Sequence, residues 1–299
     1  MAWLARQLPA TVPIWSLAAA LTVAGAATAA NPEGPQKAFV WQLADVPAPF
    51  YLVGTMHSLT KEDYPLARPY HEALAKAERV IFECDPRQRP LLVRKFREIS
   101  RYPDGQEIET ELSPATYAIL KKNSWRFATK VDALRKYRPW AIALRFLNRQ
   151  QSLGPADPRS MDYYMTREAQ RAGKELGGLE SVDEHIAFWR ELLERDGETL
   201  LLYVLTQSER TNPLIEKTRN AWRRGDAAAL TATSARLRQS NPGIAHKLLD
   251  QRNAKWVPRI EAEMRSGKPT AIVAGAAHFV GPNGVVELLR ARGHKVTRL

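Results

Sequence analysis

Short apolar runs bounded by turn residues lie near both ends of the chain, and this pattern is typical of β-strands. The runs occupy 38–44, 50–55, 79–84, 173–180, 270–278 and 295–299. The first two are separated by "DVPAP", which suits a hairpin turn. Helical patterns lie between the later runs, and Ser160 and Gly173 are suited to start and end the helix before the fourth. Strands that alternate with helices predict an α/β fold with a mixed, largely parallel sheet.

Two longer regions, at about 90–150 and 183–266, have the pattern of helices and predict large helical insertions in this fold. In the first region, Ser113 is suited to cap a helix that begins at Pro114. In the second region, glycine, proline and asparagine residues interrupt the pattern. Because these residues commonly end helices, we expect a series of hairpin-linked helices there.

The first thirty residues have the pattern of a signal peptide. Arg6 gives a positive start, residues 12–26 are apolar, and small residues follow at 27–29. We therefore expect a signal peptide at the N-terminus with cleavage after Ala29 or Ala30, and export, most simply to a bacterial periplasm. The alternative is an uncleaved membrane anchor, which the small residues at the expected cleavage site disfavour.

The remaining chain, 31–299, is long enough for one domain with its own core, and no later segment is apolar enough to span a bilayer. Cys84 is the only cysteine, so an intramolecular disulfide is excluded and a small buried thiol is expected. Lys and Arg number 44 against 32 Asp and Glu, a formal net charge of +12. The basic residues are interleaved with Glu along helical segments, which predicts solvated helix faces, and we expect no nucleic-acid partner.

Polar side chains follow four of the predicted strands at the point where each strand ends. They are His57, Glu83, Glu180 and His278. Because ligands of open α/β sheets bind outside the carboxyl ends of the strands, we expect these side chains to share one crevice. Gly54 and Gly275 precede the two histidines in matching G-x-x-H segments. A glycine there allows backbone angles that other residues avoid, and it leaves space for a close ligand.

Two imidazoles and two carboxylates at one edge favour a divalent metal ion. Catalytic sites of this kind use about three His, Asp or Glu ligands and leave a position for water. Each residue also has a structural interpretation on its own. A histidine after a strand is more often capped or buried in a core than a ligand, and a glutamate there can be a favoured N-terminal residue of a helix. The other histidines lack this setting, and we expect them to be structural or exposed: His71, His185, His246 and His294.

Several segments together are similar to the TraB/GumN family. They are "LVGTMHSLTKEDYPL", "VIFECD", "GKELGGLES", "LLDQRNAKWVPRI" and "AIVAGAAHFVGPNGVVELLRARGHKVTRL". That family is related to the Tiki proteases that cleave Wnt, and more distantly to erythromycin-esterase-like and ChaN-like proteins. The resemblance covers 39–299 and implies an α/β fold with paired G-x-x-H motifs and a metal-dependent site. Nucleotide-binding and serine-hydrolase motifs, G-x-x-x-x-G-K-[ST], G-x-G-x-x-G at the start of a helix and G-x-S-x-G, do not occur.

The resemblance also implies roles for individual residues. The metal ligands would be His57, Glu83 and His278, and the ion would be Mn, Co or Zn. Glu180 would be a fourth ligand or a general base, and Arg252 would stabilise an oxyanion or grip a substrate carboxylate. Arg252 as a surface side chain is an equal alternative. The supporting residues are Gly54, Gly275, Asn253 and Asp162.

Two functional hypotheses follow. The first is an exported metal-dependent hydrolase, a peptidase of the Tiki-like type, with a peptide or protein substrate. The second is a non-catalytic module that binds a peptide or a haem-like ligand in the same crevice. Paired carboxylates favour the enzyme, because they add little to simple capture of a ligand.

Overall fold

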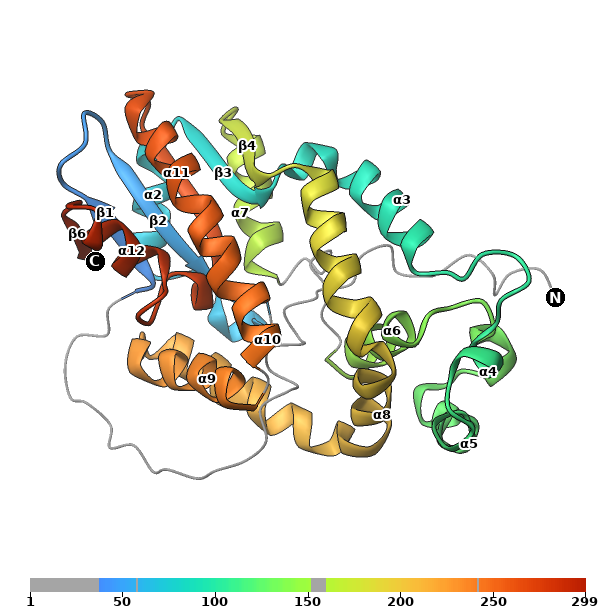
Figure 1. Cartoon of the computed structure of the whole chain (residues 1–299). Helices are drawn as coiled ribbons and strands as arrows, with labels where there is room; N and C mark the ends of the chain where they lie inside the picture. Colours follow the sequence, from blue (N-terminus) through green and yellow to red (C-terminus); the bar gives the residue numbers. More distant parts are fainter. Residues whose placement is uncertain (1–37, 58, 152–159, 241) are drawn as a thin grey trace.

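The computed structural model describes residues 38–57, 59–151, 160–240 and 242–299, so the signal peptide expected at 1–30 lies outside the described residues. A six-stranded sheet forms the left half of the molecule in Figure 1. Its strands are β1 (Val40–Leu43), β2 (Phe50–Thr55), β3 (Arg79–Cys84), β4 (Glu175–Glu180), β5 (Thr270–Gly275) and β6 (Val296–Arg298). Their spatial order is β4-β3-β5-β2-β1-β6. The four strands from β4 to β2 are parallel, whereas β1 is antiparallel to both β2 and β6. The expected mixed, largely parallel sheet is confirmed.

Most strand boundaries agree with the sequence pattern. β2 and β3 occupy the expected residues, and β1 and β2 form the expected antiparallel hairpin. The run expected at 270–278 divides instead into β5 and a 3₁₀ helix, η6 (Ala276–His278). The ladder between β5 and β3 ends at Val273, and two residues further on the backbone N–H of Gly275 donates to the Glu83 side chain, 3.0 Å away.

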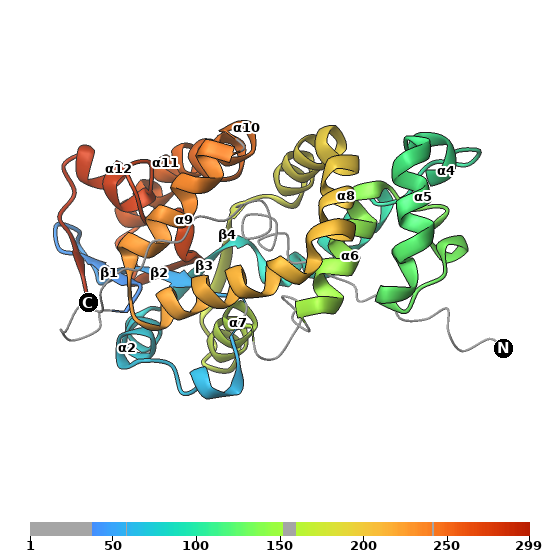
Figure 2. The ribbon, with the colours of Figure 1, turned by 90° about the horizontal axis from the view of Figure 1, so that it is seen from below.

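Helices cover both faces of the sheet. In Figure 2, α2 (Arg68–Lys76) and α7 (Met161–Arg171) lie on one face, and α11 (Arg252–Arg265) and α12 (Val285–Ala291) lie on the other. Their apolar sides bury the strands in one hydrophobic core. Gly173, with φ of +65°, follows α7, so it ends that helix as expected.

A second hydrophobic core belongs to the helical part of the molecule, on the right in Figure 1. Most of it is built from α3 (Arg89–Ile99), α4 (Ile108–Glu111), α5 (Pro114–Asn123), α6 (Pro139–Gln151) and the first half of α8 (Val182–Arg223), and four residues between 237 and 249 complete it. The 3₁₀ helices η3 (Ser124–Phe127) and η4 (Val131–Leu134) connect them. Ser113 caps α5 as expected, since its hydroxyl accepts from the backbone N–H of Thr116.

The expectation that glycine, proline and asparagine divide the segment after Glu180 into short helices is wrong for its first part. α8 runs unbroken for 42 residues, through both Gly197 and Pro213. At Gly197 an added Cβ would lie 3.3 Å from the Cβ and backbone N of Trp140. This glycine therefore lets α8 approach α6 closely rather than ending the helix. Further on, α9 (Ala227–Ser240), α10 (Pro242–Ala245) and a π-helical segment, η5 (His246–Gln251), lead into α11.

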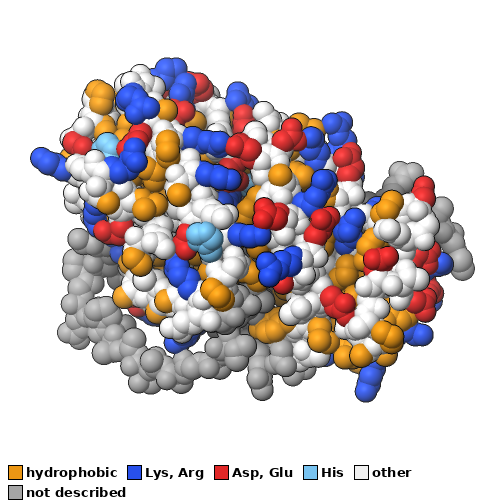
Figure 3. Space-filling view, viewed as in Figure 1, with side chains coloured by type: hydrophobic (Ala, Val, Ile, Leu, Met, Phe, Trp, Pro, Cys, Tyr) orange, Lys and Arg blue, Asp and Glu red, His pale blue; other side chains and the backbone are white. Residues whose placement is uncertain are grey.

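The 3₁₀ helices η1 (Lys61–Asp63) and η2 (Pro86–Gln88) follow β2 and β3. Figure 3 shows basic and acidic side chains interspersed over the visible face, the arrangement expected of solvated helix faces. Among the described residues, no helix combines the length and apolar character needed to cross a membrane.

Candidate functional site

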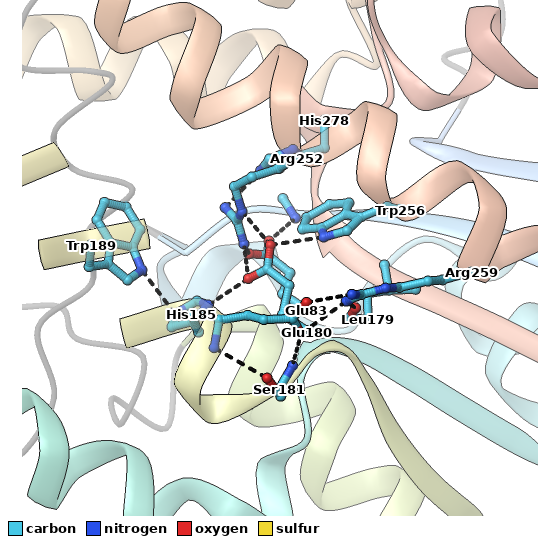
Figure 4. Close-up of polar contacts among 12 residues, drawn as sticks. Glu83, Leu179, Glu180, Ser181, His185, Trp189, Arg252, Trp256, Arg259 and His278 are labelled. Carbon is cyan, nitrogen blue, oxygen red and sulfur yellow. Dashed lines mark hydrogen bonds and ion pairs between the residues drawn. The ribbon is translucent and has the colours of Figure 1, made fainter. Parts of the chain in front are cut away.

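The carboxyl ends of four parallel strands meet at one edge of the sheet. Thr55 at the end of β2 pairs with Gly275 at the end of β5, and Cys84 at the end of β3 pairs with Glu180 at the end of β4. Side chains from segments far apart in the sequence therefore converge at this edge. Figure 4 shows the part of this convergence that is centred on Arg252 and Glu180.

Arg252, the first residue of α11, forms the centre of the site. Its Nη2 donates to Glu83 Oε2 at 2.8 Å and to Glu180 Oε2 at 2.9 Å, and its Nε donates to Glu180 Oε1 at 2.7 Å. Its Nη1 lies 3.4 Å from His278 Nε2. The side chain is 3% exposed. Although burial opposes the charged form, Glu83 and Glu180 outweigh it and raise the pKa of Arg252.

Glu180 accepts four hydrogen bonds. Besides the two from Arg252, Oε1 accepts from Trp256 Nε1 at 2.9 Å and Oε2 contacts His185 Nδ1 at 2.8 Å. Burial alone would raise the pKa of Glu180, but Arg252 and His185 outweigh it, and the pKa falls far below its usual range. A carboxylate has about four lone-pair positions, so the charge and the hydrogen-bonding capacity of Glu180 are both taken up by its neighbours.

Glu83 differs from Glu180 in its proton affinity. Oε1 accepts from the backbone N–H of Gly275 and Oε2 from Arg252. Burial dominates here and raises the pKa of Glu83 in spite of Arg252. Carboxyl groups with raised pKa values are typical of acid–base sites, because they exchange a proton closer to neutral pH.

His278 is held in one tautomer. Its Nδ1 lies 2.7 Å from Oδ1 of Asn253, and the amide of Asn253 donates in turn to the backbone oxygen of Asn283. Because an amide oxygen only accepts, Nδ1 carries the proton and Nε2 carries the lone pair. Burial and then the charge of Arg252 lower the pKa of His278 well below its usual value, so the ring is neutral. The ring packs 4.4 Å, centroid to centroid, from Trp256.

His57 belongs to a second pair at the same edge. Its Nδ1 lies 2.6 Å from Oδ2 of Asp162, whose Oδ1 accepts from the Thr55 hydroxyl at 3.0 Å. Burial opposes the charged forms, but the pair outweighs it: Asp162 raises the pKa of His57, and His57 lowers the pKa of Asp162. The negative charge of Glu83 contributes to the raised pKa of His57, which ties this pair electrostatically to the Arg252 cluster.

The special backbone angles expected at the two strand-end glycines are not found. Neither Gly54 nor Gly275 has a positive φ, so special backbone angles are not the reason for either glycine. At Gly54 the reason is space: an added Cβ would lie 3.0 Å from both the Cα and the Cβ of Ala276 and from the Cβ of Phe39. Gly54 is also fixed by hydrogen bonds to the Phe39 carbonyl and from Trp222 Nε1.

Four residues of the site were not expected from the sequence. His185 contacts Glu180, Trp256 donates to Glu180, and Phe188 and Trp256 lie under the guanidinium of Arg252 at 5.1 and 4.7 Å. Trp189 donates to His185. α8 begins two residues after Glu180, and His185 and Trp189 lie one and two turns into that helix. Their position close to a strand-end carboxylate was the feature of the sequence that could have identified them. The π-helical segment η5 directly precedes Arg252, a placement common near functional sites.

The imidazole nitrogens and the carboxylate oxygens at this edge are atom types that bind divalent metal ions. Both imidazoles have Nδ1 beside an oxygen of a neighbouring side chain, the arrangement that orients Nε2 of a metal-binding histidine. Glu83 supplies a buried carboxylate. In the described residues, however, no three His, Cys, Asp or Glu side chains form a ready-made metal-binding group. The guanidinium of Arg252 lies instead against Glu83 and His278.

Cys84 has the properties expected of a structural thiol. It is half-buried at the end of β3, and burial with the neighbouring acidic groups raises its pKa to about 12. A thiol in this state is protonated at neutral pH and is a poor nucleophile.

Comparison with known proteins gives a family and a few relatives. A model of the TraB/PrgY/gumN family matches residues 39–298. The uncharacterized protein YbaP of Escherichia coli K12 is 22% identical over 257 residues, which cover 84% of this chain and 93% of YbaP. The metalloproteases TIKI2 and TIKI1 of Danio rerio are 24% and 23% identical, over 86% and 89% of this chain. The chain spans 60% and 64% of the length of these two metalloproteases. No solved structure gives a significant match.

Proposed function

The chain belongs to the TraB/PrgY/gumN family, and we propose that it is an exported, metal-dependent hydrolase that cleaves peptide bonds. One observation carries the proposal: two imidazoles, each oriented by an oxygen at Nδ1, accompany a buried carboxyl of raised pKa at the carboxyl edge of the sheet. The similarity to two metalloproteases supports the same reaction class. Export rests on the signal-peptide pattern of the first thirty residues.

His57, Glu83 and His278 would hold the ion, which we expect to be Mn, Co or Zn. When bound, such an ion polarises a carbonyl and brings the pKa of a coordinated water toward neutrality. The histidines must be neutral to ligate. His278 is already neutral, because its pKa is strongly lowered. His57 has a raised pKa and would release a proton as the ion binds.

Arg252 would stabilise negative charge that develops on the peptide carbonyl oxygen. Its guanidinium is held by both oxygens of Glu180 and by two aromatic rings, contacts that do not involve the proposed metal ligands. Glu180 accepts four hydrogen bonds and its pKa is strongly lowered. These contacts favour a role in which Glu180 anchors Arg252 over the role of fourth ligand or general base suggested by the family resemblance.

Glu83 has two candidate roles, metal ligand and general base, and the variant Glu83→Gln distinguishes between them. If Glu83 is a ligand, the variant loses bound metal. If Glu83 takes a proton from the attacking water and passes it to the leaving amine, the variant keeps its metal but loses turnover. The raised pKa of Glu83 suits the role of general base. Its burial, beside the same arginine that His278 contacts, suits the role of metal ligand.

The proposal is tested by elemental analysis of gently purified protein, together with digestion of a quenched-fluorescent peptide library in the presence of Mn²⁺, Co²⁺ or Zn²⁺. His57→Ala and His278→Ala should each lose bound metal and cleavage. His246→Ala is the matched control, because that side chain is 61% exposed and lies outside the site. Cleavage by His57→Ala at the wild-type rate, with unchanged metal content, would overturn the proposal. Saturable peptide or haem binding without any product would identify a binding module instead.

A further inference from the structure

A chain of hydrogen bonds leads from the first turns of α8 to the guanidinium of Arg252 (Figure 4). Trp189 Nε1 donates to His185 Nε2 at 2.9 Å, and His185 Nδ1 lies 2.8 Å from Glu180 Oε2. Glu180 then binds Arg252 through both of its oxygens. His185 thus links a fully buried tryptophan of the helical core to the carboxylate that holds the central arginine.

The chemistry of these partners fixes the state of His185. An indole N–H only donates, so His185 Nε2 must accept and therefore carries no proton. An ionised carboxylate only accepts, and the strongly lowered pKa of Glu180 keeps it ionised, so His185 Nδ1 must donate. Only the neutral imidazole with its proton on Nδ1 satisfies both contacts. A protonated imidazole would place two N–H groups, those of His185 and Trp189, against each other.

The surrounding contacts hold His185 in this place. Ser181 caps α8 in a capping box with Glu184, and the Glu184 carboxylate pairs with Arg259 of α11. The side chain of His185 is 12% exposed. The backbone that carries His185 is therefore fixed at its N-terminal end by the cap and across to α11 by an ion pair.

We propose that His185 is a positioning residue, which orients Glu180 and through it Arg252 by donating one hydrogen bond from Nδ1. The part of this inference that concerns turnover rests on the proposed hydrolase function, whereas the part that concerns tautomer and geometry does not. Without the donor from His185, Glu180 loses one of its four hydrogen bonds in a buried site, and the carboxylate is held less rigidly against Arg252.

Two substitutions separate this role from a merely structural one. His185→Asn places an amide N–H close to where Nδ1 lies, so it keeps the donor to Glu180 and loses the acceptor for Trp189. His185→Gln places its amide close to where Nε2 lies, so it keeps the acceptor for Trp189 and loses the donor to Glu180. Each variant loses one of the two hydrogen bonds that His185 makes in this buried site, so we expect both to lose a similar amount of thermal stability.

The first readout is NMR of the full chain without added metal or substrate. Long-range ¹H–¹⁵N correlations should show His185 as the Nδ1–H tautomer. The hydrogen-bonded Nε–H signal of Arg252 should persist in wild type and in His185→Asn and disappear through rapid exchange in His185→Gln. An Nε2–H tautomer in wild type, or an Arg252 signal that is equally protected in the two variants, would overturn the proposal.

The second readout is cleavage of the quenched-fluorescent peptide library with Mn²⁺ added. His185→Gln should lose about tenfold or more of the wild-type turnover, in the range typical of supporting residues around a metal site, and His185→Asn should lose much less. Equal losses in the two variants would contradict a positioning role. If wild type cleaves nothing, the proposed function fails, and the NMR result still decides whether His185 holds Arg252.

Discussion

Asn253 determines which nitrogen of His278 faces Arg252. Its Oδ1 lies 2.7 Å from His278 Nδ1, and Nε2 of the same ring lies 3.4 Å from Arg252 Nη1. Both Asn253 and His278 are buried, at 1% and 0% exposure, so bulk solvent does not reach these side chains. A neutral amide beside the ring gives orientation without stabilising the imidazolium, which agrees with the strongly lowered pKa of His278.

Asn253→Asp should therefore change the charge state of His278. A carboxylate at this position favours the imidazolium, so the pKa of His278 should rise. The free energy of unfolding at pH 7 should fall by about 1–3 kcal/mol, because the carbonyl of Asn283 loses its donor. NMR titration of the histidine rings and urea denaturation measure the two effects. Asn123→Asp, which removes a similar amide–carbonyl bond from α5, is the control and should leave His278 unchanged.

Removal of Arg252 should destabilise the fold strongly. Arg252→Met leaves two buried carboxylates without their cation, and breaking a buried pair in this way costs about 3–5 kcal/mol. Arg68→Met breaks an exposed i,i+4 pair with Glu72 and should cost about 0.3–0.5 kcal/mol. Urea denaturation of the two variants gives the comparison. A similarly small loss of unfolding free energy in both variants would mean that the ion pairs of Arg252 with Glu83 and Glu180 contribute little to stability.

The pair of His57 and Asp162 should make stability depend on pH in a defined window. The pKa of His57 is raised, so its contribution is fully present below the unfolded value of about 6.5 and is lost as pH rises through the folded value. The pKa of Asp162 is lowered, so its contribution is present above about 3.9 and is lost as pH falls through the folded value.

Asp162→Asn should therefore lower the free energy of unfolding between about pH 3.9 and 6.5. The expected loss is about 1.5–3 kcal/mol, the amount typical of a hydrogen bond to a charged group, and it should become smaller as pH rises toward 9. Thermal melts at pH 5.5, 7 and 9 in EDTA measure the difference from wild type. Asp183→Asn, at a carboxylate that is 78% exposed, should show no such window. A difference between wild type and Asp162→Asn that stays constant across this pH range would argue against the ion pair.

Gly54→Ala should destabilise the sheet edge that carries the site. The added methyl group would meet Ala276 and Phe39 at 3.0 Å in a fully packed region, and overpacking of this kind costs about 1–3 kcal/mol. Gly243→Ala is the matched control, because nothing lies within 4 Å of an added Cβ at that exposed helical position. That change should stabilise the protein by about 0.5–1 kcal/mol. Chemical denaturation of the two variants measures the change in the free energy of unfolding. Equal changes in both would mean that space at Gly54 is not limiting.

The sequence by itself determined most of the strands, the start of one helix and the edge at which the strand-end residues gather. Apolar runs bounded by turn residues predicted β2 and β3 to the residue, and a serine before a proline predicted the start of α5. These features depend on neighbours within a few positions, so the local pattern contains them. The parallel arrangement then follows from alternating strands and helices, and it brings the ends of β2, β3, β4 and β5 together.

Only the tertiary structure decided what the site residues contact. Arg252 and Glu83 lie 169 positions apart in the sequence, and no local pattern states that they form an ion pair. The need for Gly197 in α8 depends on Trp140 of α6, which an added Cβ would crowd, and the need for Gly54 depends on Ala276. The same holds for His185, whose tautomer is set by one neighbour on α8 and one on β4. Packing and charge pairing between distant segments are properties of the folded chain, and they decide which groups share a proton or a cation.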